Sequence, residues 1–225
     1  MDSAFLSRSQ PAGREIRQDR DVDPESDGEY WNHNTAFHPE ILRRCAATTG
    51  DVLDVGCGDG LLVARIARTG RPVVGIERDP GAADVARRRC ADLPRVTIVE
   101  SGFEQVQLET RSFGFVTMVA TLHHLDTAAA LTRAAELLHP GGRLYVLGLV
   151  RIASKRDVAG AVAAIPRARV VGAVRREHWP DGVPIADPEQ TFDELAREVR
   201  TTLPGARLRR RAYYRYSLEW TKNGS

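Results

Sequence analysis

The chain has 225 residues, of which 42% are hydrophobic, and this composition excludes a wholly disordered polymer and allows one substantial core. All but two of its 32 basic residues are arginine and its formal net charge is only +2. We therefore expect the arginine runs to be solvated faces, and we expect no nucleic-acid partner. The three cysteines form no Cys-x-x-Cys pair, which indicates neither a disulfide framework nor a zinc site and favours reduced thiols in a cytoplasm.

The first part of the chain is polar. Residues 1–28 mix Asp, Arg, Ser, Pro and Gly without the apolar stretch of a signal peptide, so we expect them to be flexible. No run elsewhere approaches the roughly 18 apolar residues that a membrane span needs, so we expect no membrane partner. The segment 30–38 is dense in aromatic and hydrogen-bonding groups, and residues 39–47 are expected to form a helix.

From residue 51 onward, short β-branched runs alternate with longer helical stretches. This alternation is typical of parallel strands joined by helical crossovers and predicts a doubly wound α/β sheet. Pro80 suits the first position of a helix, and the run from His139 to Gly142 is expected to end one. Strands are expected at 52–55, 73–76, 96–99, 116–120 and 144–148, and helices at 61–68, 81–91 and 128–138.

Beyond the fifth strand the regular alternation stops. Residues 151–188 form an insertion with an apolar stretch and Trp179, and insertions of that length in compact folds are commonly lids or binding loops. We then expect a helix at 189–202 and two antiparallel strands within the alternating region 208–220.

The sharpest motif is VLDVGCGDG at residues 52–60, in which a buried strand runs into Gly56, Gly58 and Gly60 and then into a helix. Such glycines let the backbone turn tightly and lie against a ligand, while the start of the helix offers unpaired N–H groups. A ligand site is therefore expected here. A dinucleotide fingerprint would need a glycine where the chain has Leu61, so a dehydrogenase is the least favoured enzyme class.

Two acidic residues accompany this loop. Glu77 ends the next strand, where a carboxylate can accept hydrogen bonds from two ribose hydroxyls. Asp54 lies in the strand that leads into the loop. Either acid alone could merely cap a helix or solvate the edge of the sheet, but their spacing relative to the glycines favours a binding role.

These residues resemble the first and second motifs of the class I S-adenosylmethionine-dependent methyltransferases, in particular the group similar to the ubiquinone-biosynthesis and small-molecule enzymes. The resemblance is clear over residues 52–150. It implies a Rossmann-like α/β fold, whose seven-stranded and mainly parallel sheet has an antiparallel last strand. It also implies a single methyltransferase domain over 1–225, with an N-terminal helical lid at 29–48, a cofactor-binding core at 49–150, a lid insertion at 151–188, and a C-terminal helix and strands at 189–225.

The same resemblance implies that S-adenosyl-L-methionine is the cofactor and S-adenosyl-L-homocysteine the product. By this likeness, Glu77 faces the ribose and Arg78 covers the adenine. Asp54, Gly56 and Gly58 face the methionine part.

One departure from the family pattern concerns the adenine. The family usually has an Asp after the third strand, whereas this chain has Gly102. Gly102 and Phe103 could still bind the adenine, through a backbone N–H and an apolar wall. Alternatively, Glu104, one turn further on, could take the place of the missing Asp. A second departure, Gly114 at the start of the fourth strand, is expected to affect only strand geometry.

Methyl transfer is expected to take place where the fourth strand ends, because ligands of this fold bind at the carboxyl edge of the sheet. The resemblance puts the methyl group close to Ala120. The Asp/Asn-Pro-Pro-aromatic motif of enzymes that methylate nucleic-acid amines is absent from this point. His123 or His124 could act as a base or an orienting donor near neutral pH, and we favour His123; the alternative is a structural hydrogen bond to the backbone.

Similar methyltransferases fold an N-terminal segment over the cofactor, which would bring residues 30–38 to the acceptor. Tyr30, His33 and His38 are then candidate acid–base groups. Alternatively, His38 caps the following helix while the aromatic residues anchor the segment on the sheet.

These features predict methyl transfer to a small, aromatic or heteroaromatic acceptor, at an O, N or C atom, by a cytoplasmic monomer or homodimer of secondary metabolism. No Asp/Glu/His cluster with metal spacing accompanies the histidine pair, so no metal is expected. The alternatives are an RNA or protein methyltransferase that docks through its arginine-rich tail, and a non-catalytic cofactor-binding partner subunit.

Overall fold

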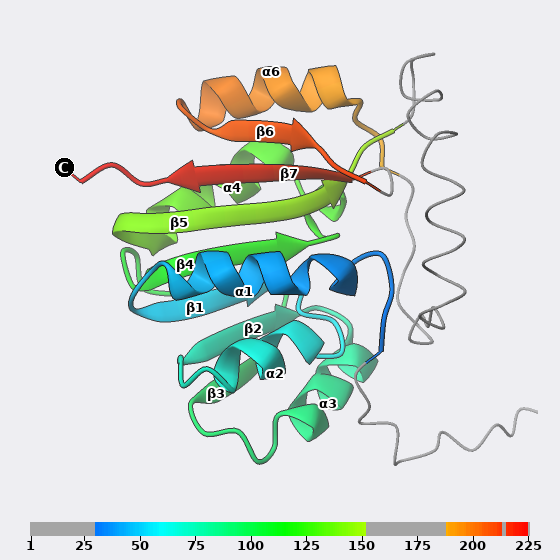
Figure 1. Ribbon diagram of the computed structural model, residues 1–225, viewed down its shortest axis with the longest axis vertical. Coiled ribbons are helices and arrows are strands. Elements are labelled where there is room, and N and C mark those ends of the chain that lie inside the picture. The colour runs from blue at the N-terminus through cyan, green and yellow to red at the C-terminus, as the bar shows by residue number, and fades with distance from the viewer. Residues whose placement is uncertain (1–29, 152–187, 213–214, 225) are drawn as a thin grey trace, which may run out of the picture.

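A seven-stranded sheet forms the centre of the structure, a computed structural model that describes residues 30–151, 188–212 and 215–224. The strand order is β3-β2-β1-β4-β5-β7-β6 (Figure 1). Strands β1 to β5 pair in parallel, and β7 pairs antiparallel with both β5 and β6. This topology confirms the predicted sheet with its antiparallel last strand. The strands are β1 (Asp51–Val55), β2 (Val73–Glu77), β3 (Val96–Glu100), β4 (Phe113–Val119), β5 (Leu138–Leu149), β6 (Arg207–Arg210) and β7 (Arg215–Thr221).

Helices α3, α4 and α6 follow residues whose side chains accept a hydrogen bond from an unpaired N–H group of the first turn. The side chain of Asp79 accepts from Ala82 ahead of α3, and Thr191 forms a capping box with Glu194 ahead of α6. Pro80 is the first residue of α3, as predicted. The helical segments are η1 (Thr35–Phe37), α1 (His38–Ala46), α2 (Leu61–Ala67), α3 (Pro80–Arg89), η2 (Leu122–His124), α4 (Thr127–Leu137) and α6 (Phe192–Thr202).

Several boundaries differ from the sequence prediction, and two of the differences have a clear physical cause. Helix α6 begins at Phe192 rather than at residue 189, because the capping box fixes its start. Strand β5 begins at Leu138, so the His-Pro-Gly-Gly run expected to lie between helix and strand is part of the strand. Hydrogen bonds to Lys222 hold it there, from the N–H of Gly141 to the Lys222 carbonyl and from the N–H of Lys222 to the Gly142 carbonyl, each 2.9 Å.

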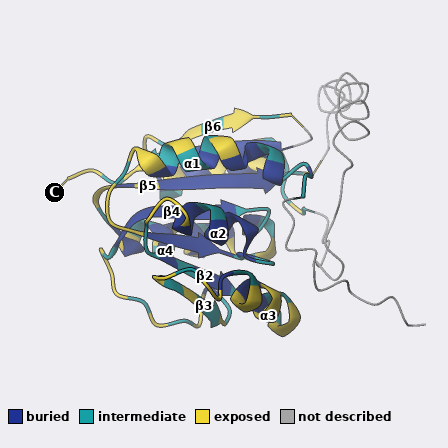
Figure 2. Ribbon diagram, turned by 60° about the horizontal axis from the view of Figure 1, so that its bottom comes forward, coloured by how far each residue is buried: buried dark blue, intermediate teal, exposed yellow. Residues whose placement is uncertain are grey.

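Both faces of the sheet are covered by helices. Helices α1, α2 and α3 pack on one face, where Ile41 and Val52 belong to one buried cluster. Helices α4 and α6 pack on the other, where Leu53 and Leu131 belong to a second. Neighbouring residues of β1 thus serve opposite faces, as the alternation of a strand requires. Figure 2 shows the central strands buried and the outer sides of α1 and α3 exposed.

The segment that precedes α1 lies at the edge of the sheet where the parallel strands end (Figure 1). The predictions for residues 1–28, and nearly all of the predicted lid insertion at 151–188, fall outside the described residues. Within the described ranges, no helix is long and apolar enough to cross a membrane.

Candidate active site

A cavity of about 660 Å³ opens at the carboxyl ends of β1, β2, β3 and β4, beneath the segment that precedes α1. The order of the sheet reverses between β1 and β4, and such a switch point is where doubly wound folds bind ligands. Gly60, His33 and His123 are not among the residues that line the cavity. The predicted site residues that do line it are Tyr30, His38, Asp54, Gly56, Gly58, Glu77, Arg78, Gly102, Phe103 and Ala120.

The glycine loop brings backbone close to this cavity. Gly56 has a φ of +70°, and a Cβ at this position would lie 2.3 Å from Oγ1 of Thr121, so only glycine fits. Gly58 has a φ of +55° and nothing within 4 Å of its Cβ position, so its bare face borders open space. Gly60 packs instead against α3, with a Cβ position 2.8 Å from Cβ of Ala86. Gly60 therefore allows the close packing of α3. It does not line the cavity in which the sequence predicted its contact with the cofactor.

Glu77 is fixed at the end of β2 by two backbone donors. Its Oε2 accepts from the N–H of Gly58 and its Oε1 from the N–H of Asp79, each at 2.9 Å. Because both donors are backbone groups, the carboxylate is held without a counter-charged side chain.

Asp54 is an uncompensated acid at the floor of the cavity. Its side chain is 2% exposed, and Oδ1 has no hydrogen-bond partner within the described residues. Burial, followed by the negative charge of Glu77, raises the pKa of Asp54 to about 7. A buried carboxylate without a partner is costly, so this atom fits a ligand that brings hydrogen-bond donors or positive charge. The α-ammonium of the methionine part of S-adenosylmethionine is such a group.

Glu104 occupies the space beside Gly102 at the end of β3. A Cβ on residue 102 would lie 2.8 Å from Oε1 of Glu104. The Glu104 carboxylate therefore stands next to the place from which the family's usual Asp would extend. Phe103 is 4% exposed and lines the cavity with its ring under the guanidinium of Arg133, at 5.1 Å.

The end of β4 carries local strain. Ala120 has a φ of +54°, a left-handed conformation that residues other than glycine seldom adopt, and its N–H donates to the Leu147 carbonyl at 2.7 Å. The chain then turns through η2, where the rings of His123 and His124 lie against each other with their centroids 4.0 Å apart. His124 lines the large cavity, whereas His123 lines a second cavity of about 240 Å³ on the side of α4 and α6.

Of the two histidines, the sequence favoured His123, whereas the structure places His124 on the wall of the large cavity. Burial, and then the positive charge of His124, lower the pKa of His123 to about 4. Burial, and then the positive charge of Arg78, also lower the pKa of His124, while Glu77 opposes them. Both rings are therefore neutral at pH 7.

The N-terminal segment contributes Tyr30, Asn34 and His38 to the cavity wall. Tyr30 hydrogen-bonds the Asp59 carboxylate, and burial, then the charge of Asp59, raise the pKa of Tyr30, so the phenol stays protonated. Asp59 is itself held by Arg89 at 2.9 Å, in an ion pair whose side chains are 13% and 8% exposed. The segment is thus tied to the glycine loop.

His38, a candidate acid–base group, is hydrogen-bonded to an arginine. Nη1 of Arg65 lies 2.8 Å from Nδ1 of His38, and because a guanidinium has only donors, Nδ1 must accept. Burial, then the charge of Arg65, lower the pKa of His38 to about 3. The ring is therefore neutral with its proton on Nε2, which can only donate. His33 packs edge-on against Trp31, with ring centroids 5.7 Å apart, away from the cavity wall.

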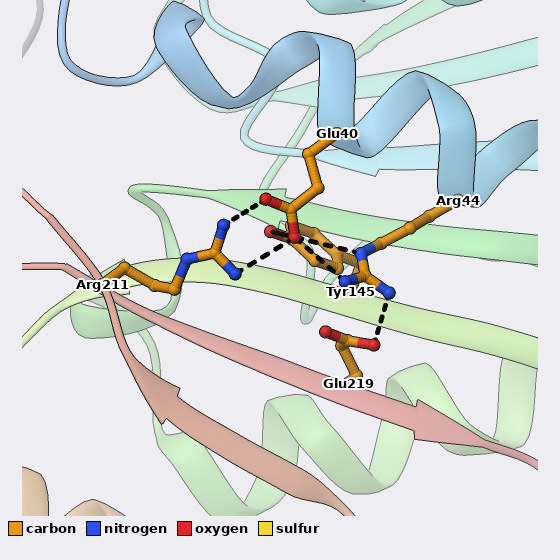
Figure 3. Close-up of polar contacts among 5 residues, drawn as sticks. All are labelled: Glu40, Arg44, Tyr145, Arg211 and Glu219. Atoms are coloured by element: carbon orange, nitrogen blue, oxygen red, sulfur yellow. Dashed lines mark hydrogen bonds and ion pairs between the residues drawn. The ribbon is translucent and has the colours of Figure 1, made fainter.

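Charged residues dock α1 on the C-terminal strands (Figure 3). Glu40 pairs with Arg211 and accepts from Arg44 at 3.0 Å. Arg44 also pairs with Glu219 of β7 at 2.5 Å and lies over the ring of Tyr145, 5.2 Å from its centroid. Because α1 follows directly on the segment that lines the cavity, these contacts fix that segment relative to β5 and β7.

The described part of the chain contains no group of three or more His, Cys, Asp and Glu side chains that could hold a metal ion.

Comparison with known proteins identifies the family. Residues 53–146 match the family described as "Methyltransferase domain". An uncharacterized methyltransferase of Mycobacterium tuberculosis is 35% identical over 195 residues, which cover 84% of this chain and 96% of that relative. The chain belongs to the methyltransferase family. A ubiquinone biosynthesis O-methyltransferase of Xanthomonas oryzae is 40% identical over 106 residues, covering 44% of this methyltransferase and 43% of the relative.

The fold agrees with this assignment. The solved structure of a SAM-dependent methyltransferase from Aquifex aeolicus matches with a TM-score of 0.57 at 16% identity, covering 82% of this chain and 88% of that one. The methyltransferase family and the fold implied by the resemblance are thus confirmed. The methyltransferase has further cavity residues that the sequence analysis did not select, Asn34 and Thr121 among them, because only their tertiary position brings them to the wall.

Proposed function

We propose that this methyltransferase transfers the methyl group of S-adenosylmethionine to a small aromatic or heteroaromatic acceptor. The observation that carries the proposal is a single cavity of about 660 Å³ that extends from the glycine loop to the polar N-terminal segment. This volume lies within the roughly 300–1,000 Å³ of small-molecule sites. It favours an acceptor that is enclosed beside the cofactor over a polymer that lies across the surface.

The cofactor, when bound, supplies an electrophilic methyl group. Asp54 would bind its α-ammonium, because the buried Oδ1 lacks any other partner. Glu77 would bind the ribose hydroxyls, because backbone donors already hold its carboxylate at the end of β2. Glu104 would accept from the adenine amino group, since its carboxylate stands beside Gly102. This arrangement would replace the Asp that the family usually has.

His124 would remove the acceptor's proton. It lines the cavity as a neutral imidazole, as His38 does, but the accepting nitrogen of His38 is already occupied by Arg65. His38 would instead donate from Nε2, and Tyr30 would remain a phenol that fixes Asp59. The transfer requires the acceptor atom to be aligned with the methyl group, and these rigidly held side chains would supply that alignment.

The contacts of the arginine run 209–211 weigh against a nucleic-acid acceptor. Arg211 pairs with Glu40 and lies over the ring of Phe37, and Arg210 lies 4.0 Å from the centroid of Phe192. Two of the three arginines thus pack within this chain, which leaves less of the run to contact phosphates.

The proposal is tested by incubating the protein with methyl-labelled S-adenosylmethionine and a panel of phenols, anilines and N-heterocycles, with total RNA and a protein extract in parallel. We expect label on at least one small aromatic acceptor and none on RNA. Salt-dependent labelling of RNA would contradict the proposal and identify a nucleic-acid enzyme. Tight binding of S-adenosylhomocysteine without any turnover would favour a non-catalytic partner.

A further inference from the structure

We propose that Asn34 is an acceptor-binding residue that donates its side-chain N–H groups to an oxygen atom of the acceptor, and that Arg215 of β7 is the positioning residue that orients it. The inference rests on the proposed function, and it assigns a role to two residues that the sequence analysis left out.

The orientation of the Asn34 amide follows from the chemistry of its partner. Nε and Nη2 of Arg215 lie 3.0 and 2.5 Å from one atom of the amide. A guanidinium has five donors and no acceptor, so that atom must be the oxygen, Oδ1. The nitrogen, Nδ2, is therefore turned away from Arg215, and it makes no hydrogen bond within the described residues. Asn34 lines the cavity, so this unbonded nitrogen is the donor that the residue can offer to a ligand there.

Asn34 is held on the acceptor side of the cavity. The proposed cofactor residues Asp54, Glu77 and Glu104 follow β1, β2 and β3, which lie on one side of β4. Arg215 begins β7, which lies on the other side of β4, beyond β5, and pairs with Leu149 at the end of β5. A side chain anchored to Arg215 therefore approaches the cavity from the side opposite the cofactor residues.

The donor is rigidly placed. Arg215 is only 6% exposed, so its own side chain has little freedom. The backbone N–H of Asn34 donates to Oδ1 of Asn32 at 2.9 Å, and its carbonyl accepts from the N–H of Phe37 at 3.1 Å. The pairing of Arg211 with Glu40 docks the following helix on the same side of the sheet (Figure 3). Binding sites commonly use hydrogen-bond donors that are held in place before the ligand binds, and the Asn34 amide beside the Arg215 guanidinium is such a donor.

The chemical class of the acceptor group follows. An amide N–H₂ beside a guanidinium favours oxygen lone pairs and disfavours a protonated amine, which has only donors and carries a positive charge. A phenolic oxygen fits this requirement. The inferred acceptor is therefore an aromatic molecule with an oxygen substituent that contacts Asn34.

The test is a ¹⁵N–¹H correlation spectrum of the full chain saturated with S-adenosylhomocysteine and titrated with phenol, with toluene as the matched control. The side-chain N–H₂ signals of Asn34 are assigned by their loss in Asn34→Asp. We expect phenol, and not toluene, to shift them, and we expect Asn34→Asp and Arg215→Met to weaken phenol binding by about tenfold. Arg87→Met, which removes only the exposed ion pairs of Arg87 with Asp84 and Glu100, should leave phenol binding unchanged, and Arg215→Lys should restore part of the binding lost in Arg215→Met.

Signals that move on addition of S-adenosylhomocysteine alone would assign the donor to the cofactor and overturn the inference. If phenol shifts the signals of other cavity residues but not the side-chain N–H₂ signals of Asn34, the inference is wrong and the proposed function still stands. A protein that fails to bind S-adenosylhomocysteine at all would refute the proposed function and this inference together.

Discussion

The carboxylate of Glu77 accepts a hydrogen bond at 2.9 Å from the backbone N–H of Gly58, nineteen residues earlier in the chain. The contact joins the glycine loop after β1 to the acid that ends β2. The two parts of the motif are therefore a single preformed unit, and a ligand that binds there finds the carboxylate already aimed.

Replacing Glu77 by Ala should weaken S-adenosylhomocysteine binding by at least about tenfold, because a charge-assisted hydrogen bond to the ribose and the tie to Gly58 are both lost. Isothermal titration measures the change. Glu109→Gln, at an exposed position away from the cavity, serves as the control and should bind as the parent does. Equal affinity in Glu77→Ala and the parent would show that another group holds the ribose.

Glu104→Gln should remove the preference for adenine. The parent should bind S-adenosylhomocysteine about tenfold more tightly than the analogue whose adenine amino group is replaced by oxygen, since Glu104 only accepts hydrogen bonds and the analogue offers no amino donor. In the variant the two affinities should converge. A preference that survives the substitution would assign the adenine contact to the backbone at Gly102 or Phe103.

Asp54→Asn should stabilise the protein without ligand at high pH. Folding raises the pKa of Asp54 to about 7 from its ordinary 3.8, so the folded state favours the protonated form. The resulting penalty is absent below the unfolded value, grows as the pH rises, and is complete above pH 7. The variant should therefore gain about 4 kcal/mol in unfolding free energy at pH 8, at roughly 1.4 kcal/mol per pKa unit, and nothing near pH 3.

The same Asp54→Asn substitution should weaken S-adenosylhomocysteine binding at pH 8, because the α-ammonium loses its counter-charge. Denaturant unfolding at the two pH values and titration calorimetry check the pair of effects. A variant less stable than the parent at pH 8 would mean that the Asp54 carboxylate is already satisfied in the unliganded protein.

His124→Asn should lower kcat for an acceptor found in the panel by at least about a hundredfold and leave S-adenosylhomocysteine affinity within about twofold. Since the pKa of His124 lies below 6.5, the parent's rate should be level from pH 7 to 8 and fall as acid protonates the base. The variant should lose this acid limb. His123→Asn is the matched control, and a larger loss of rate in His123→Asn than in His124→Asn would reverse the assignment.

The order of the elements and the glycine loop were predictable because both depend on local pattern. Alternation of strand and helix, the proline at the start of α3, and the spacing of Gly56, Gly58 and Glu77 are all properties of short stretches. The choice between His123 and His124 was not predictable, since it depends on how η2 turns after the strained Ala120.

Contacts between distant parts of the chain set the remaining features. Arg65 makes Nδ1 of His38 an acceptor through a hydrogen bond across 27 residues, and Arg215 reaches Asn34 across 181. Neither arginine differs in the sequence from the many others, so no local signal selects it. The start of β5 likewise depends on a residue distant in the sequence, because its backbone pairs with that of Lys222.

The central claim is that the cavity at the carboxyl edge of β1 to β4 binds S-adenosylmethionine. Isothermal titration of the purified protein with S-adenosylhomocysteine, with NADH as the control, tests it most directly, because the product needs no knowledge of the acceptor. The account predicts micromolar binding of S-adenosylhomocysteine and none of NADH. Absence of S-adenosylhomocysteine binding, or equal binding of NADH, would contradict it.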